Sequence, residues 1–134
     1  MAVMANSYQQ YMRHDVMMAT PMDLVVMLYS GCIKRLRLAQ MAIGKKDYEA
    51  TNNNLQRAQD IVMELIMGLD LQYDIAKELM TIYEYVHRQI IRINASKDAA
   101  MIDPITEIMS NLRDTWVQVQ KECKTTARYE YESE

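Results

Sequence analysis

Apolar residues recur at alternating intervals of three and four through most of this chain, and few residues interrupt the pattern. The 134 residues include only three glycines and two prolines. Spacing of three and four places side chains on one side of an α-helix, whereas a half-buried strand needs alternation at every second residue. Long uninterrupted helices therefore fit this chain better than short strands joined by turns.

The clearest helical segment is 19–39, which opens with a helix-start signal. Thr20 is a suitable N-cap, Pro21 occupies the first helical position, and Asp23 stands near the positive end of the helix dipole. Gly44, followed by two lysines, is expected to end this helix as a C-terminal cap. The residues expected to face the core are Val25, Leu28, Tyr29, Cys32, Leu36, Ala39 and Ile43.

Three further segments repeat this periodicity. The second helix is expected from the N-cap Asp47 to about Met67 with Gly68 as C-cap, the third from about Tyr73 to Ala95, and the fourth from Asp103-Pro104 to about Cys123. Asparagines 52–54 are poor helix formers and should weaken the start of the second helix. The expected core residues are Leu55, Ala58, Val62, Leu65 and Leu69, then Ile75, Leu79, Ile82, Val86, Ile90 and Ile93 with Tyr83 on the flank, then Ile105, Ile108, Leu112, Thr115, Trp116, Val119 and Cys123.

Short connections between long helices make sequential neighbours antiparallel. The sequence therefore predicts an all-α fold, an antiparallel up-down four-helix bundle with a short N-terminal arm. The expected divisions are an arm over 1–18, a bundle over 19–123 and a disordered tail over 124–134. Within the arm, Met4, Tyr8 and Tyr11 fall on one side of a short helix.

The charge and cysteine content narrow the classes of function. The net charge is −3 with acidic and basic residues interspersed, which disfavours a nucleic-acid-binding face. Cys32 and Cys123 are too few and too far apart for a disulfide framework, which fits a reducing cytosol. The N-terminus does not resemble a signal peptide, and no stretch approaches the roughly 20 apolar residues of a membrane span. A cytoplasmic location without membrane insertion is expected.

The residues that could support catalysis do not form a recognisable set. Glu84 and His87 make one ExxH pair, but a di-iron bundle needs two such pairs and two further glutamates. An exposed pair is the preferred interpretation. The chain has no nucleophile elbow, phosphate-binding glycine loop or HExxH motif. We expect neither an enzyme nor a bound cofactor.

Surplus apolar residues are the unusual feature of this sequence. They lie away from the expected core on three helices and are spaced so that they line up along each one. Such lines of apolar residues usually mark an interaction site. Three occupants stay open at this point: the N-terminal arm, a second copy of the chain, and an amphipathic helix of a client protein. The residues are Leu24, Met27, Leu38 and Met41, then Ile66 on the core flank with Met63 and Met67, then Tyr73, Met80 and Ile91 joined by His87.

An ordered set of short motifs over about residues 8–121 resembles the family of the flagellar export chaperone FliS. The densest part is YQQY with Tyr8 and Tyr11, then Ala19-Thr20-Pro21, then Met27-Leu28-Tyr29 with Gly31. The later matches are Ala58-Gln59, Glu64-Leu65, Tyr83-Glu84-Tyr85, Arg88, Asn94, and Leu112-Arg113-Asp114 with Trp116. The chain departs from the family pattern at Met22, Ser30 and Gly68.

The resemblance implies a cytoplasmic chaperone that binds the disordered C-terminal region of flagellin, prevents premature polymerisation and assists delivery to the flagellar type III export gate. It also implies that the arm covers part of the bundle, and it leaves room for contact with another flagellar regulator or co-chaperone. The alternative is a self-associating helical regulatory or scaffold module without a flagellin client, and a homodimer stays open. The expected partner-binding residues are Tyr8, Tyr11, Leu24, Met27, Ile66, Met63, Met67, Tyr73, Met80 and Ile91.

Overall fold

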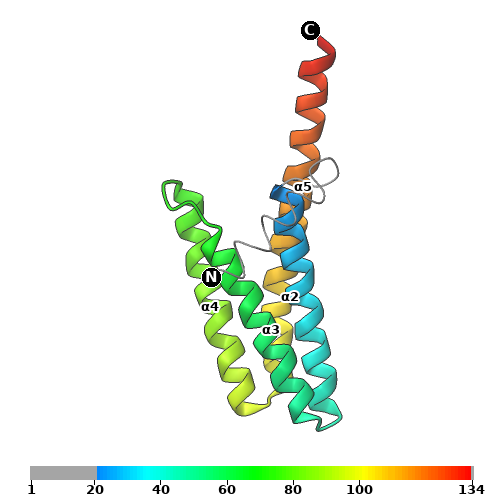
Figure 1. The fold of residues 1–134 in the computed structure, drawn as a ribbon, viewed down its shortest axis with the longest axis vertical. Coiled ribbons are helices and arrows are strands. Elements are labelled where there is room, and N and C mark those ends of the chain that lie inside the picture. Colours follow the sequence, from blue (N-terminus) through cyan, green and yellow to red (C-terminus); the bar gives the residue numbers. More distant parts are fainter. Residues whose placement is uncertain (1–20, 134) are drawn as a thin grey trace.

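Four long α-helices run alternately up and down in the computed structural model, which describes the backbone of residues 21–133 and the side-chain surroundings of 22–123 (Figure 1). The helices are α2 (Pro21–Gly44), α3 (Tyr48–Met67), α4 (Asp74–Ser96) and α5 (Ile102–Ser133), and a 3-10 helix, η1 (Ala99–Met101), precedes α5. No strand occurs between residues 21 and 133. The predicted all-α antiparallel bundle is confirmed. The predicted arm, with Tyr8 and Tyr11, lies outside the described residues.

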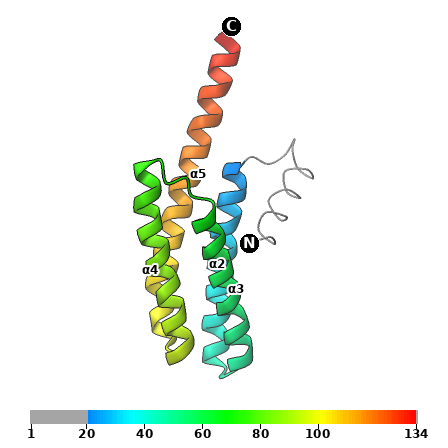
Figure 2. The ribbon, with the colours of Figure 1, turned by 60° about the vertical axis from the view of Figure 1, so that its left-hand side comes forward.

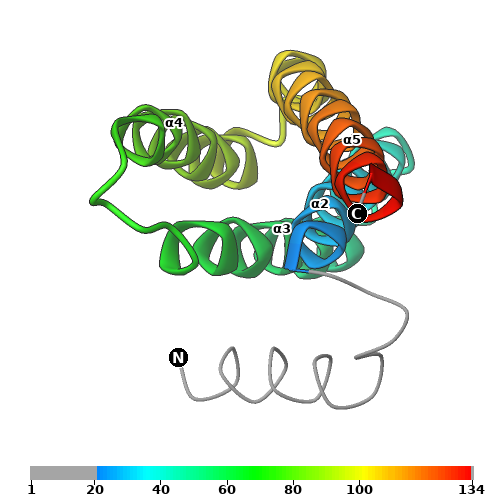
Figure 3. The same cartoon turned by 90° about the horizontal axis from the view of Figure 1, so that it is seen from above.

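The four helices do not contact one another equally. α2 packs along both α3 and α5, and α4 packs along α3. α4 and α5 have far fewer contacts with each other, although η1 joins them at one end of the bundle (Figure 3). Figure 2 shows α5 continuing past the ends of the other three helices. The four helices enclose one hydrophobic core cluster, and α4 depends mainly on α3 for its position.

Buried side chains from all four helices form the hydrophobic core, at the spacing that the sequence predicted for α2 and α3. Tyr29, Cys32, Leu36 and Ala39 on α2 are fully buried. The predicted core residues of α3 are also buried, apart from Leu69, which is partly buried against the core. Burial of these side chains is the dominant stabilising contribution, at about 1.5–3 kcal/mol for each large apolar side chain.

Two of the residues expected on the inward face of α4 are replaced by the residue that follows each of them. Ile75, which was expected in the core, is 61% exposed, and its neighbour Ala76 is buried instead. Tyr83, expected on the flank, is 2% exposed, while Ile82 is only partly buried. The buried residues follow an unbroken alternation of three and four that includes a small residue and a tyrosine: Ala76, Leu79, Tyr83, Val86, Ile90 and Ile93.

The start of α5 was also predicted incorrectly. Asp98 caps η1, because its side chain accepts a hydrogen bond from the backbone N–H of Ala100 at 3.0 Å. η1 then continues directly into α5, so Asp103 lies inside the first helical turn and is not an N-cap. Pro104 is tolerated there because the first N–H groups of a helix have no intrahelical acceptor.

The inward face and the end of α5 differ from the prediction as well. Thr115 and Cys123 are exposed, whereas Thr106 and Met109 are buried. The C-terminal part of α5 extends past the other three helices, so no facing helix covers it (Figure 2). The helix continues to Ser133, so residues 124–133 are helical and do not form the predicted disordered tail. This stretch contains no glycine or proline that would end a helix.

A lysine takes the left-handed position after α2 and after α4, although the sequence suggested Gly44 for the first of these two ends. Gly44 remains helical, and Lys46 adopts the left-handed conformation with φ 58°. Asp47 caps α3 as predicted, with its side chain accepting from the N–H of Ala50 at 3.1 Å, and Gly68 is the C-cap of that helix. Lys97 is left-handed after α4, with φ 56°.

Two of the three consecutive asparagines on α3 join it to neighbouring helices. Asn94 on α4 donates through Nδ2 to Oδ1 of Asn52 at 2.8 Å. Arg35 on α2 donates to Oδ1 of Asn54 at 3.2 Å. Asn53 between them is exposed. These contacts between helices offset the low helix propensity of the two flanking asparagines.

Candidate functional site

Large apolar side chains are exposed on α2, α3 and α4, as the sequence predicted. The predicted partner-binding residues fall into three groups. Met27, Met63, Met67, Tyr73 and Ile91 are exposed. Leu24, Ile66 and Met80 are partly exposed. Tyr8 and Tyr11 lie outside the described residues.

The exposed apolar residues are most concentrated where α3 ends and α4 begins. Met67 is 46% exposed, Leu71 50%, Tyr73 64% and Ile75 61%. We call these four residues the α3–α4 tip, which stands at one end of the bundle in Figure 1. Leu71 and Ile75 were not among the predicted site residues, because the pattern gave Leu71 no helical face and placed Ile75 in the core.

A second line of residues follows the outer side of α4. Tyr73, Met80 and Ile91 are separated by intervals that bring them to nearly the same side of a helix with 3.6 residues per turn. The line begins at the α3–α4 tip and extends for about 27 Å along the helix. His87, which was expected to join it, is partly exposed. An elongated partner such as a helix would match this geometry better than a small molecule.

Methionines provide much of this exposed surface. Met27 on α2 and Met63 and Met67 on α3 are each at least 40% exposed. The side chain of methionine is unbranched and polarisable, so it adapts its shape to different apolar partners. These methionines therefore add adaptable apolar side chains to the surfaces of α2 and α3.

A buried polar contact between three helices lies inside the bundle. The indole Nε1 of Trp116 on α5 donates a hydrogen bond to the hydroxyl of Tyr29 on α2 at 3.0 Å. The Tyr29 hydroxyl also forms a hydrogen bond with the hydroxyl of Tyr83 on α4. The two tyrosine rings are tilted by 55°, with centroids 6.2 Å apart. Tyr29 is therefore the common partner that joins α4 and α5 to α2.

Both tyrosines remain protonated at neutral pH. Burial raises the pKa of Tyr29, and the hydrogen bonds to Tyr83 and Trp116 oppose that increase. Burial also raises the pKa of Tyr83, and the hydrogen bond to Tyr29 raises it further. Neutral hydroxyl groups satisfy one another in the core without a buried charge. The contact is suited to holding the helices together and not to acid–base chemistry.

Cys32 and the ExxH pair of α4 are the reactive groups that the sequence singled out. Burial raises the pKa of the Cys32 thiol to about 12, so it is not a nucleophile at neutral pH. Glu84 of the ExxH pair is exposed. Within the described part of the chain, no three His, Cys, Asp or Glu side chains are grouped so that they could hold a metal ion. None of the described helices is both long enough and apolar enough to cross a bilayer.

The four helices define the class of protein as an all-α antiparallel helical bundle. A solved structure described as a flagellar chaperone from bacteria is similar to this one with a TM-score of 0.73. The similarity covers 88% of this chain and 98% of the other, at 22% sequence identity. At this identity the similarity establishes the shared fold.

Sequence comparison identifies the family within that class. The family model for the flagellar protein FliS matches residues 4–123, so the chain belongs to the FliS family. The flagellar secretion chaperone FliS of Bacillus subtilis is 36% identical over 120 residues, covering 89% of this chain and 90% of that protein. The protein with the same description from Vibrio cholerae is 31% identical, covering 78% of each chain. The counterpart from Salmonella typhimurium is also 31% identical, covering 78% of this chain and 79% of that one.

Proposed function

We propose that this protein is a cytoplasmic export chaperone for flagellin. It binds the disordered C-terminal region of flagellin, prevents premature polymerisation and assists delivery to the flagellar type III export gate. Membership of the FliS family supports the proposal, since relatives of this chain are described as flagellar secretion chaperones. The observation on the molecule that carries it is the exposed apolar surface of α2, α3 and α4.

The physical basis is the cost of ordering a flexible client. A disordered segment loses conformational entropy when it binds, so it needs a large apolar contact to compensate. The α3–α4 tip and the line along α4 offer apolar side chains over a length that suits a helical segment. A rigid bundle adds no ordering cost of its own.

We assign the partner-binding role to the exposed residues of α3 and α4 first, and to Leu24 and Met27 on α2 second. We also propose that Tyr8 and Tyr11 belong to an arm that competes for part of the same surface. On this proposal the α2 residues are shared between arm and client.

The test is a binding measurement with two forms of flagellin. Isothermal titration with full-length flagellin should show binding with a negative heat-capacity change, because apolar surface is buried. Flagellin lacking its last ~40 residues, a length of roughly two helices, should not bind. Equal affinity for the two forms would exclude the proposal.

Sedimentation of the protein alone addresses the alternative function. A stable dimer that buries the α3–α4 tip and takes up no flagellin would indicate a self-associating helical module. A monomer that forms a complex with flagellin would support the chaperone.

A further inference from the structure

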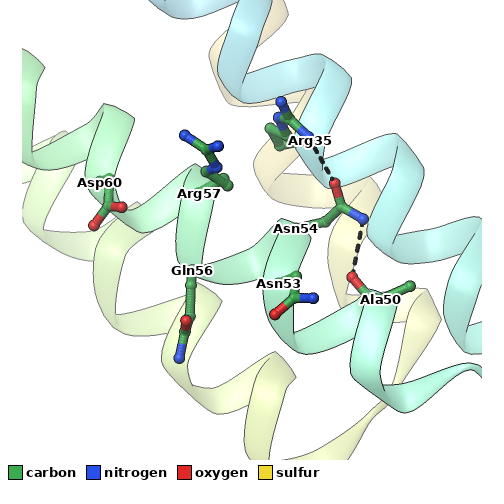
Figure 4. A pocket seen from close by; sticks show the side chains of 7 residues that line it. All are labelled: Arg35, Ala50, Asn53, Asn54, Gln56, Arg57 and Asp60. Atoms are coloured by element: carbon green, nitrogen blue, oxygen red, sulfur yellow. Dashed lines mark hydrogen bonds between the residues drawn. The ribbon is translucent and has the colours of Figure 1, made fainter.

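A polar trough lies on the face shared by α2 and α3, away from the exposed apolar tip. It has a volume of about 560 Å³ and runs along α3 from Ala50 to Asp60 (Figure 4). Its polar lining consists of Arg35, Asn53, Asn54, Gln56, Arg57 and Asp60, and Ala50 is the one apolar residue among the lining side chains. The part of α3 that forms it is about 15 Å long, since each helical residue adds 1.5 Å.

The two arginines differ in how they are held. Arg35 donates to Asn54, whose amide nitrogen donates in turn to the backbone carbonyl of Ala50 at 2.9 Å. Arg35 is therefore fixed in position at one side of the trough. Among the described residues, Arg57 has no hydrogen-bond or ion-pair partner, and its side chain is exposed. A fixed guanidinium beside an uncommitted one favours an anionic group with two oxygen atoms.

Other polar groups surround these cations. Asn53 and Gln56 are exposed amides, and each provides donors and an acceptor of the kind that pair with a peptide backbone. Asp60 is the single carboxylate at the trough, and Figure 4 places it at the end beyond Arg57. Its negative charge contributes to raising the pKa of Glu64, after burial of that group. The trough thus has one positive charge at its α2 side, from Arg35, a second on α3, from Arg57, and a negative charge at one end, from Asp60.

We propose that this trough binds a short acidic segment of a protein partner, with Arg57 and Arg35 receiving the carboxylate of an Asp or Glu side chain. Nucleic acid is disfavoured by Asp60 and by the overall net charge of −3. A small organic ligand is disfavoured because such ligands need a mostly apolar pocket. The proposal goes beyond chaperoning of flagellin, since it holds for any partner that presents acidic side chains.

The test is NMR titration of the uniformly ¹⁵N-labelled full chain with two blocked peptides. One peptide is acetyl-Gly-(Glu)₄-Gly-amide and the other replaces the four glutamates with glutamines. The glutamate peptide should shift signals from residues 50–60 and 35, and the glutamine peptide should not. Sodium acetate at the same carboxylate concentration shows whether an isolated carboxylate is enough, and we expect it to bind more weakly than the peptide.

Three variants assign the effect to the trough. Arg57→Gln should weaken binding of the glutamate peptide by up to about fivefold, which is the upper end of the range for an exposed charge pair. Arg88→Gln is the matched control, since Arg88 is an exposed arginine on α4 outside the trough and the charge change is the same. Asp60→Asn should strengthen binding, because it removes the carboxylate that repels the peptide.

Two results would overturn the proposal. The first is equal shifts with the glutamate and glutamine peptides. The second is equal weakening by Arg57→Gln and Arg88→Gln, which would mean that only the overall charge matters. Neither result bears on flagellin binding, so this proposal and the proposed function can fail separately.

Discussion

The indole Nε1 of Trp116 lies 3.0 Å from the hydroxyl oxygen of Tyr29, although the two residues are 87 positions apart in the chain. This contact joins the last helix of the bundle to the first. The same hydroxyl contacts Tyr83, so one oxygen atom serves two partners on two other helices. Because α4 has few contacts with α5, this atom is an important link between the two halves of the bundle.

Removing the Tyr29 hydroxyl, which has two hydrogen-bond partners, should lower the free energy of unfolding more than removing the Tyr83 hydroxyl, which has one. Tyr29→Phe leaves both Trp116 Nε1 and the Tyr83 hydroxyl without their partner, and we expect a loss of about 2–3 kcal/mol in the free energy of unfolding. Tyr83→Phe should cost about 1 kcal/mol, because Tyr29 keeps its contact with Trp116. Urea denaturation measures both, with the exposed Tyr85→Phe as a control near zero. A larger loss for Tyr83→Phe than for Tyr29→Phe would contradict the role given to Tyr29.

Relieving the left-handed conformation at Lys46 should stabilise the protein. A residue with a Cβ atom at φ 58° costs roughly 1 kcal/mol relative to glycine. Lys46→Gly should therefore raise the free energy of unfolding by about 0.5 kcal/mol, after allowance for the greater freedom of glycine in the unfolded chain. Lys45→Gly is the matched control, because Lys45 does not have positive φ, and it should be neutral or destabilising. Thermal denaturation of the two variants distinguishes them, and equal midpoints would argue against strain at Lys46.

The contact between Asp103 and α2 should depend on pH. Hydrogen bonds from Gln40 at 3.0 Å and Arg37 at 2.7 Å lower the pKa of Asp103 below its usual 3.8. A lowered folded-state pKa stabilises the protein above the unfolded-state pKa, and this contribution is lost as pH falls below 3.8 through the folded-state value. Asp103→Asn should lower the melting temperature slightly at pH 6.

The pH dependence of that difference is the decisive measurement. The wild-type and Asp103→Asn melting curves should converge as pH falls through the folded-state pKa of Asp103, because the carboxyl is then protonated in both states. Because both side chains are mostly exposed, the difference should also shrink at high salt. A difference that persists unchanged at low pH would mean that the carboxylate charge is not its source.

The two cysteines should react at very different rates with a thiol reagent. Cys123 is exposed, whereas Cys32 is buried with its pKa raised to about 12. Brief treatment of the native protein with iodoacetamide should add one group, at Cys123, and treatment in urea should add two. Mass spectrometry counts the groups, and Cys123→Ser should remain unmodified in the native state. Rapid modification of Cys32 without denaturant would show that the core opens more readily than its packing suggests.

A charge at the α3–α4 tip should weaken binding of flagellin. Met67→Glu places a carboxylate within the proposed contact surface, where losing water costs free energy, and we expect affinity to fall about tenfold. Met41→Glu is the matched control, since Met41 is 57% exposed on α2 at the opposite end of that helix from Met27. The free energy of unfolding of both variants should lie within about 0.5 kcal/mol of the wild-type value, as expected for exposed positions. Equal loss of affinity for the two variants would show that the α3–α4 tip is not the specific binding surface.

Helical periodicity was sufficient to predict the bundle and the inward faces of α2 and α3. It was misleading for α4, where the strongly apolar Ile75 and Ile82 were assigned to the core. The structure buries Ala76 and Tyr83 instead. A tyrosine can be buried at low cost only when another group forms a hydrogen bond with its hydroxyl. Tyr29, 54 residues away in the chain, forms that hydrogen bond with Tyr83. No local pattern contains that information.

The ends of the helices also depend on contacts that a local sequence pattern does not contain. Asp103-Pro104 is a common helix-start pair, but η1 already supplies the turn before it, and the carboxylate contacts α2. Gly44 suggested a left-handed cap that the structure gives to Lys46. For the exposed surface, periodicity correctly placed Met27, Met67 and Tyr73 outside. Periodicity did not identify Leu71, because that residue lies between α3 and α4, where helical spacing cannot assign a side chain to the core or to the surface.

The position of Trp116 gives this protein an internal optical reporter. It is the only tryptophan in the chain, and its indole contacts a tyrosine that is itself bonded to a second tyrosine. Selective excitation of the indole therefore gives an emission spectrum that originates where α2, α4 and α5 meet. A shift of that emission on adding a client would report rearrangement around the contact between Trp116 and Tyr29, without any attached dye.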